Sequence, residues 1–188
     1  MSEVKTKNVI TPVCRASYAH VWEKSEMPNG DWKYSISLII PKDDPDIPKI
    51  KACIEQAGIN KFGSDKTKWP KPFWNPLRDG DEERVEKAYA NSYFLSPKSD
   101  RTVGVVGPDA KPIMDQDEFY SGCYCRASIN YYGFDNAGKK GVGVGLNNVM
   151  KIGDSERLDG KIAAEDEFSN FASDEAETQD SGEDFLDQ

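Results

Sequence analysis

The chain has 188 residues, enough for one globular domain of ordinary size or for one domain with a tail. Apolar residues make up 37%, below the roughly 45–50% of an average soluble chain, and charged residues make up 30%. Residues 165–188 hold ten acidic residues and no Lys or Arg, whereas residues 1–164 hold 24 basic and 23 acidic residues, a net of 24 − 23 = +1. The net charge of −9 therefore belongs to an acidic tail on a nearly neutral body.

Several classes of protein are excluded at this point. The chain has no run of 18 apolar residues, so it offers no membrane-spanning helix. The first residues lack the charged-then-apolar layout of a secretory signal, so we expect a cytoplasmic protein with no membrane partner. His20 is the only histidine, and the four cysteines show no metal-site or disulfide spacing: Cys14, Cys53, Cys123 and Cys125. We expect neither a cofactor nor a metal.

The first part of the body predicts a β-hairpin followed by a helix. Residues 9–22 are rich in β-branched and aromatic types, and residues 32–40 alternate between apolar and polar types, which is typical of a half-buried strand. Asn29-Gly30 supplies the turn. We expect one face of the second strand to be buried: Trp32, Tyr34, Ile36, Leu38 and Ile40. Apolar residues at near-helical spacing then predict an amphipathic helix that begins near Asp44 and ends at Gly58.

The remaining body alternates between loops and short strands. Residues 68–81 hold three prolines and predict an irregular loop, and a short helix over 82–90 follows. Short strands are expected within 93–106, and the glycine-rich segment 141–153 predicts a return strand after the strand at 119–134. Short strands with one intervening helix favour a small, closed or nearly closed β-barrel over residues 1–160. Residues 161–188 have too few large apolar residues to offset the entropy of ordering, so we expect a disordered tail.

The strand at 119–134 carries the main candidate site. Its inner face is small and apolar, whereas Arg, Ser and Asn on the opposite face would make a poor core. Tyr124 and Tyr132 are therefore expected to point outward beside Arg126, near Lys139 and Lys140. Flat rings flanked by cations suit unpaired bases and phosphates of single-stranded nucleic acid. An ordinary solvated strand face with two tyrosines is the alternative.

The proline-rich loop is a second candidate, because Trp69, Phe73 and Trp74 lie among Lys68, Lys71 and Arg78. Simple packing of this loop on the barrel competes with that interpretation. Gly141, Gly143 and Gly145 do not form a dinucleotide-binding motif; they would let DNA approach the backbone closely or would curve the barrel.

Catalytic patterns are weak by comparison. No phosphate-binding loop or nucleophile elbow is present, and a catalytic triad could use only His20. Asp115, Asp117 and Glu118 could bind Mg²⁺ in a nuclease, although a solvated loop explains these carboxylates better.

The tail combines charge with apolar anchors at its tip. This tip is the expected partner-binding segment: Asp180, Glu183, Asp184, Phe185, Leu186 and Asp187. It can imitate a nucleic-acid strand or dock on a basic, apolar pocket of a partner. A flexible chain of 24 residues has an end-to-end distance of about 27 Å, compared with a radius of gyration of about 15 Å for the body. Competition between the tail and DNA is therefore credible.

Four segments in this order resemble a family of tailed-bacteriophage single-stranded DNA-binding proteins: 75–81 (NPLRDGD), 119–123 (FYSGC), 131–132 (YY) and 140–147 (KGVGVGLN). The resemblance covers residues 5–160. It implies an OB-fold, a five-stranded barrel with one or two inserted helices. It also implies sequence-tolerant binding of single strands in replication, recombination or repair, in the host cytoplasm if the chain is phage-encoded, and a tail that contacts replication or recombination proteins.

We accordingly interpret the chain as a non-catalytic single-stranded DNA-binding protein. Lys33, Arg15, Trp74 and Arg78 are further expected contacts. The tail departs from the broader group of single-strand binders because Leu186, Asp187 and Gln188 follow Phe185. The main alternative is a protein-interaction module that never binds DNA, which the nearly neutral body favours. The oligomeric state stays open, a homodimer included, as do site size, cooperativity and the preference for DNA or RNA.

Overall fold

The computed structural model describes residues 7–136, 138–159 and 167–172. The strands are β1 (Val9–Ile10), β2 (Cys14–Glu26), β3 (Trp32–Pro41), β4 (Arg78–Asp79), β5 (Ser92–Leu95), β6 (Lys98–Ser99), β7 (Gly104–Val106), β8 (Tyr124–Asn136) and β9 (Lys139–Gly153). The helices are α1 (Ile47–Phe62) and α2 (Gly80–Glu83), and the 3-10 turns are η1 (Lys66–Lys68), η2 (Lys87–Tyr89), η3 (Gln116–Glu118) and η4 (Ser169–Phe171).

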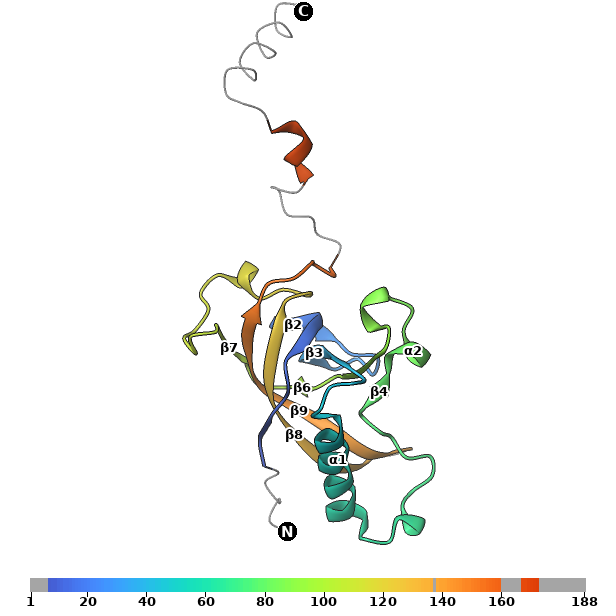
Figure 1. The fold of residues 1–188 in the computed structure, drawn as a ribbon. Helices are drawn as coiled ribbons and strands as arrows, with labels where there is room; N and C mark the ends of the chain where they lie inside the picture. Colours follow the sequence, from blue (N-terminus) through green and yellow to red (C-terminus); the bar gives the residue numbers. More distant parts are fainter. Residues whose placement is uncertain (1–6, 137, 160–166, 173–188) are drawn as a thin grey trace, which may run out of the picture.

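Five of the strands close a barrel. β2 pairs with β3, β3 with β6, β6 with β9, β9 with β8, and β8 returns to β2. β6 runs parallel to β9, while the other four pairings are antiparallel. Outside this ring, β5 pairs with β3 and with β4, β1 pairs with β8, and β7 pairs with β9 (Figure 1). The predicted five-stranded OB-fold is confirmed.

The barrel interior follows from the alternation along the strands. The residues of β3 that belong to the main core are Ile36, Leu38 and Ile40, and those of β8 are Cys125, Ala127, Ile129 and Tyr131. They meet the buried side chains of β9, which are Val142, Val144, Leu146 and Val149. A smaller second cluster forms outside the ring, where Tyr89 and Phe94 cover Ile39 and the Tyr89 hydroxyl bonds to Ser37. The outer face of β3 is therefore partly buried as well.

Helix α1 packs against β8 and β9, but its bounds differ from the prediction. Asp44 forms a turn before the helix, since its carbonyl accepts from the Ile47 N–H and its carboxylate accepts from the Asp46 N–H. At the other end, Gly58 is an interior helical residue. The ring of Trp69 lies only 2.5 Å from where a Cβ of residue 58 would be, so glycine here makes room for an aromatic ring and does not end the helix.

Two further expectations were wrong. Trp32 is 59% exposed because it pairs with Glu26 next to the turn of the β2–β3 hairpin, beyond the part of the sheet that the core covers. Residues 82–90 form only the end of α2 and the turn η2, with extended backbone at Arg84 and Glu86 between them. This extended link brings Tyr89 into the second cluster, which a continuous helix would not do.

Other expectations can be compared with the described residues. No helix among them is long and apolar enough to cross a membrane. The four cysteines are free, and three of them are buried. The division at residue 160 stays a prediction, because residues 160–166 and 173–188 lie outside the described part of the chain. Within the tail, the described segment 167–172 contains the turn η4, where Phe168 and Phe171 make an edge-to-face contact.

Candidate nucleic-acid interface

The outer face of β8 has the composition that the alternation predicted. Cys125, Ala127, Ile129 and Tyr131 are buried, while Tyr124 is 42% exposed and Tyr132 is 41% exposed. The two tyrosines point outward as expected, but they do not share a site. Eight residues of strand separate them, a distance of about 26 Å at 3.3 Å per residue. Tyr124 lies beside Arg15 and Gly153, whereas Tyr132 lies beside Gly143 near the β8–β9 turn.

Gly141, Gly143 and Gly145 of β9 accommodate the protein's own groups. A Cβ at Gly143 would lie 2.7 Å from the ring of Tyr132, and a Cβ at Gly145 would lie 2.5 Å from the amide oxygen of Asn130. A Cβ at Gly141 would lie 2.3 Å from the backbone oxygen of Trp74. Close approach is therefore the explanation, with the approaching groups supplied by the chain itself.

Trp74 is fastened to β9 by its main chain. Its N–H donates to the Lys140 carbonyl at 2.9 Å, and its own carbonyl accepts from the Val142 N–H at 3.1 Å. The side chain remains 37% exposed. The Arg78 guanidinium lies 4.1 Å and the Lys139 ammonium 4.6 Å from the centre of the indole. Trp74 is therefore an aromatic surface flanked by two cations.

The other two rings of the proline-rich loop are used for packing. Trp69 and Phe73 stack with their centroids 5.1 Å apart, and both contact Phe62 at the end of α1. The two interpretations of this loop thus apply to different residues: Trp69 and Phe73 pack, while Trp74 is presented to solvent.

A cluster of lysines adjoins Trp74. Lys98 lies opposite Ser35 on β3, two residues from Lys33, and opposite Gly145 on β9. Partial desolvation lowers the pKa of Lys98, and the nearby charges of Lys33 and Lys139 lower that pKa further. Lys33 also forms an ion pair with Asp100, with 3.5 Å between the charged atoms, so Lys98 and Lys139 carry the excess positive charge of this cluster. The inferences from sequence missed Lys98, because its two-residue strand has no recognisable pattern and only the strand pairing brings it to the cluster.

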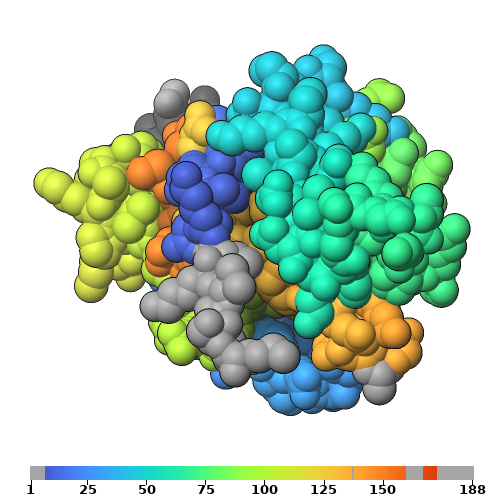
Figure 2. Space-filling view, turned by 90° about the horizontal axis from the view of Figure 1, so that it is seen from below, coloured from blue at the N-terminus to red at the C-terminus, as the bar shows by residue number. Residues whose placement is uncertain are grey.

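We call Lys33, Lys98, Lys139, Trp74, Arg78 and Tyr132 the basic-aromatic face. In chain order, the five barrel strands β2, β3, β6, β8 and β9 are strands one to five. The β2–β3 connection is therefore the loop between strands one and two, and the β8–β9 connection is the loop between strands four and five. Figure 2 shows these two hairpins, blue and orange, at the same edge of the molecule. OB-folds bind oligonucleotides on the face of strands two and three, between these loops. The lysine cluster occupies this position.

Three other residues that were predicted to contact DNA make hydrogen bonds or an ion pair within the protein. Arg15 donates from Nε to the Gly122 carbonyl at 3.3 Å and from Nη2 to the Glu156 carbonyl at 2.7 Å. Arg126 donates to the Thr11 carbonyl at 3.0 Å. Lys140 forms a loose ion pair with Asp135, with 3.8 Å between charged atoms. Arg15 and Arg126 therefore hold neighbouring segments of backbone, and Lys140 keeps an exposed ammonium beside the β8–β9 turn.

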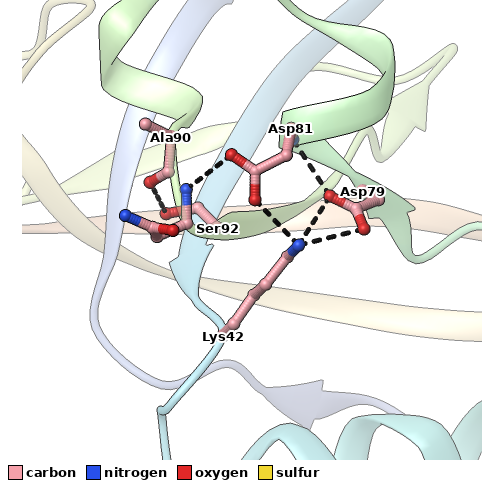
Figure 3. A network of polar contacts seen from close by, with 6 residues as sticks. Lys42, Asp79, Asp81, Ala90 and Ser92 are labelled. Carbon is pink, nitrogen blue, oxygen red and sulfur yellow. Dashed lines mark hydrogen bonds and ion pairs between the residues drawn. The ribbon is translucent and has the colours of Figure 1, made fainter.

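The segment 75–81 is explained by a charged network at the end of β3 (Figure 3). The Lys42 ammonium lies 2.8 Å from a carboxylate oxygen of Asp79 and 2.8 Å from one of Asp81, and Asp81 also accepts from the Asn91 N–H at 2.9 Å. Hydrogen bonds from Lys42 lower the pKa values of both carboxyl groups. Gly80 is required between them because a Cβ would lie 2.4 Å from the Tyr89 carbonyl. We call Lys42, Asp79 and Asp81 the lysine clamp.

The clamp fixes the strand that carries Arg78. Arg78 pairs with Phe94 in β4–β5 and forms an ion pair with Glu83. Asp79, the next residue, is held by Lys42 and caps α2 through the Asp81 N–H. The clamp therefore sets the position from which Arg78 reaches the Trp74 ring.

The carboxylates of the nuclease alternative do not form a metal site. The Asp115 carboxylate accepts from the Asp117 N–H at 2.9 Å and caps η3. Within the ranges 7–136, 138–159 and 167–172, no group of three His, Cys, Asp or Glu side chains could hold a metal ion. The predicted tail contacts, from Asp180 to Asp187, lie outside the described residues.

Comparison with solved structures identifies the same fold. The single-stranded DNA-binding protein from bacteriophage Enc34 in complex with ssDNA superposes with a TM-score of 0.68 at 23% identity, covering 84% of this chain and 96% of that one. The single-stranded DNA-binding protein gp2.5 encoded by bacteriophage T7 gives a TM-score of 0.61 at 14% identity, covering 90% of this chain and 97% of that one.

Sequence comparison identifies the family. Protein p50 of Acyrthosiphon pisum secondary endosymbiont phage 1 is 31% identical over 185 residues, which covers 93% of this chain and 97% of that protein. Residues 7–182 match the family model described as Enterobacter phage Enc34, ssDNA-binding protein. The chain, with its closed barrel and basic-aromatic face, therefore belongs to the Enc34-type family of phage single-stranded DNA-binding proteins.

Proposed function

We propose that this protein binds single-stranded DNA without strong sequence preference and without catalysis, through the basic-aromatic face. Lys33, Lys98 and Lys139 neutralise backbone phosphates, and Trp74 and Tyr132 stack on unpaired bases. Family membership supports the substrate class. The observation that supports the assignment of the face is the pairing of β6 with β3, which places Lys98 next to Lys33, together with an indole that has Arg78 and Lys139 over it.

The lysines of the basic-aromatic face weaken the main argument for a protein-interaction module. That alternative rests on a nearly neutral body, but DNA responds to the potential where it binds, and salt screens charges beyond about 10 Å at 0.1 M. Titration with labelled single- and double-stranded DNA separates the two functions. A wild-type chain that binds neither nucleic acid at low salt would leave the interaction module as the better account.

The stacking roles are tested by truncating one ring at a time. Trp74→Ala and Tyr132→Ala should each weaken binding to oligo-dT by about 1–3 kcal/mol, the range for one stacked base. Trp74→Phe keeps a ring at the same position and should retain most of the affinity. Fluorescence anisotropy at fixed salt measures both effects. Equal affinities for wild type and both alanine variants would remove these rings from the interface.

We also propose that the acidic tail competes with DNA for the basic-aromatic face. Ten negative charges within 165–188 complement the lysine cluster. The tail follows the Gly153 end of β9, whereas Lys139 begins that strand fourteen residues earlier, up to about 46 Å away along a straight strand. Residues 160–188, taken as a flexible chain of 29 residues, would have an end-to-end distance of about 27–32 Å. Reaching this face on its own barrel therefore requires some extension, and a neighbouring molecule is an equally accessible target.

Deleting residues 165–188 tests this competition. Binding of the truncated protein to oligo-dT should tighten, and the gain should shrink as salt rises because screening weakens the tail's attraction to the lysines. No gain at low salt would exclude the competition.

The biological role follows from the same binding. We propose that the protein coats exposed strands during phage DNA replication, recombination or repair in the host cytoplasm. Its tail tip, from Asp180 to Asp187, would recruit replication or recombination proteins. Pull-down with a tail peptide, compared with a peptide in which Phe185 and Leu186 are replaced by Ala, tests the recruitment.

A further inference from the structure

A cleft of about 930 Å³ opens between β2, the turn η2 and the segments 117–121 and 156–159. None of the six residues of the basic-aromatic face lines it. Two of the three tyrosines on its walls, Tyr18 and Tyr120, come from segments about one hundred residues apart in sequence. The cleft is therefore a second concave surface, separate from the proposed binding face.

Each of these tyrosines is paired with a guanidinium. Arg84 lies 5.4 Å from the centre of the Tyr18 ring, and Arg157 lies 4.4 Å from the centre of the Tyr120 ring. Tyr18 is 49% exposed, and its hydroxyl donates a hydrogen bond to the Glu86 carboxylate. The rings are thus held in place while part of the Tyr18 surface stays open to the cleft.

The backbone at Tyr18 departs from regular strand geometry, which turns the side chain outward. Its φ of +44° lies in the left-handed region, which is rare for a bulky residue that is not glycine. The register between β2 and β3 shifts between Ser17 and His20, which marks a bulge at this position. A bulge redirects a side chain out of the regular alternation, and strained residues of this kind cluster at binding sites.

Tyr124 adjoins the same cleft. Arg15 lines the cleft and lies directly opposite Tyr124 in the β2–β8 pair. Side chains of directly opposed residues point to the same side of a sheet, with their Cβ atoms about 5 Å apart. Tyr124 therefore belongs to this end of β8, while Tyr132 belongs to the basic-aromatic face about 26 Å away.

The charge of the cleft favours bases over phosphates. Its lining carries three cations, Arg15, Lys87 and Arg157, and four anions, Glu86, Asp117, Glu156 and Asp159, a net of 3 − 4 = −1. Such a surface offers little attraction to a phosphate backbone. Stacking of a base on an aromatic ring is not an ionic contact, so the affinity lost when a ring is removed from this cleft should be about the same at low and at high salt.

We propose that this cleft and the strand surface next to it form a second base-binding site for the same single strand, in which Tyr18 on the cleft wall and Tyr124 beside the cleft stack on unpaired bases beyond the segment held by the basic-aromatic face. The proposal rests on the proposed function. It implies that a short oligonucleotide occupies the basic-aromatic face alone, whereas a longer one also reaches the cleft.

Oligonucleotide length separates the two sites. Oligo-dT of about 6 and of about 20 nucleotides bracket much of the 4–16 nucleotide range for one OB-fold. The double variant Tyr18→Ala/Tyr124→Ala should bind the longer oligonucleotide on the order of tenfold or more weakly, with the shorter one unaffected. This loss should be the same at low and at high salt. Tyr18→Phe keeps the ring, so it should bind the longer oligonucleotide more tightly than Tyr18→Ala does.

Three results would overturn the proposal: an unchanged affinity of a folded double variant for the longer oligonucleotide, an equal loss on both lengths, or a loss that disappears at high salt. Circular dichroism and the melting temperature establish that the variant is folded. If it does not fold, Tyr124→Ala alone on both lengths provides the same comparison. Failure of the proposed function is distinct, because the wild-type protein would then bind neither length.

Discussion

The ring of Tyr132 lies over the Cα of Gly143, so close that a Cβ at residue 143 would stand 2.7 Å from the ring atoms. The two residues are directly paired in β8–β9. The glycine therefore determines where the tyrosine ring lies, and through it the shape of the surface offered to a base.

Gly143→Ala should accordingly weaken DNA binding although it replaces no side chain that is proposed to bind DNA. The added methyl displaces the Tyr132 ring, so we expect a loss approaching that of Tyr132→Ala, up to about 1–3 kcal/mol. Gly153→Ala is the matched control on the same strand, because no described atom lies within 4 Å of a Cβ there. Oligo-dT titration of both variants measures the difference, and identical affinities would show that the Tyr132 ring position is unimportant.

Lys98→Gln should reduce the salt dependence of binding. If Lys98 neutralises one phosphate, the slope of log affinity against log salt becomes shallower by about 0.7, the value per phosphate for single strands. Lys111→Gln, on the exposed loop after β7, removes an equal charge and should leave the slope unchanged. Titrations across a salt series decide this, and a slope that stays the same for Lys98→Gln would place Lys98 outside the DNA path.

The lowered pKa of Lys98 predicts opposite effects of alkaline pH on stability and on binding. Between that pKa and the ordinary value of 10.5, the unfolded chain holds the proton more firmly than the native protein does. The unfavourable contribution of Lys98 to stability, present at lower pH, is therefore lost as pH rises through this window. DNA binding needs the charged form, so the contribution of Lys98 to affinity falls over the same window.

This pH effect is measured as a difference between wild type and Lys98→Met, since the other lysines titrate in both proteins. Relative to the variant, the wild type should gain unfolding free energy and lose oligo-dT affinity from neutral pH toward 10.5. An affinity ratio that does not change with pH would contradict the assignment.

Lys42→Met should lower the melting temperature and weaken DNA binding, although Lys42 lies outside the basic-aromatic face. Without the ammonium, the carboxylates of Asp79 and Asp81 repel each other, and Arg78 loses the anchored strand from which it reaches Trp74. Lys51→Met is the matched control, because both ammonium groups lie 5.4 Å from the Tyr93 ring. Equal effects of the two substitutions would assign the role to the ring contact and not to the lysine clamp.

Periodic features of the fold were predictable from the chain. The two-residue period of residues 119–134 correctly separated buried Cys125 and Ile129 from exposed Tyr124 and Tyr132, because one face of a barrel strand meets a dry core. The same rule failed at Trp32. Alternation says which face a residue occupies, but not where along the strand the core ends.

Features that depend on tertiary pairing could not be predicted. Lys98 joins Lys33 and Lys139 only through the short strand β6. Gly58 looks like a helix terminator until the Trp69 ring is placed against it. Tyr124 and Tyr132 were expected to form one site because they share a strand face, and strand length alone separates them.

Trp74 has a practical consequence of its own. Of the four tryptophans, Trp69 is packed on Phe73, the indole N–H of Trp22 is bonded to the Phe119 carbonyl, and Trp32 is exposed next to the turn of the β2–β3 hairpin. Trp74 alone has two cations over its exposed ring. A nucleobase laid against this indole should quench its emission. A Trp69→Phe background would sharpen the signal, so the unlabelled protein can report its own occupancy in real time.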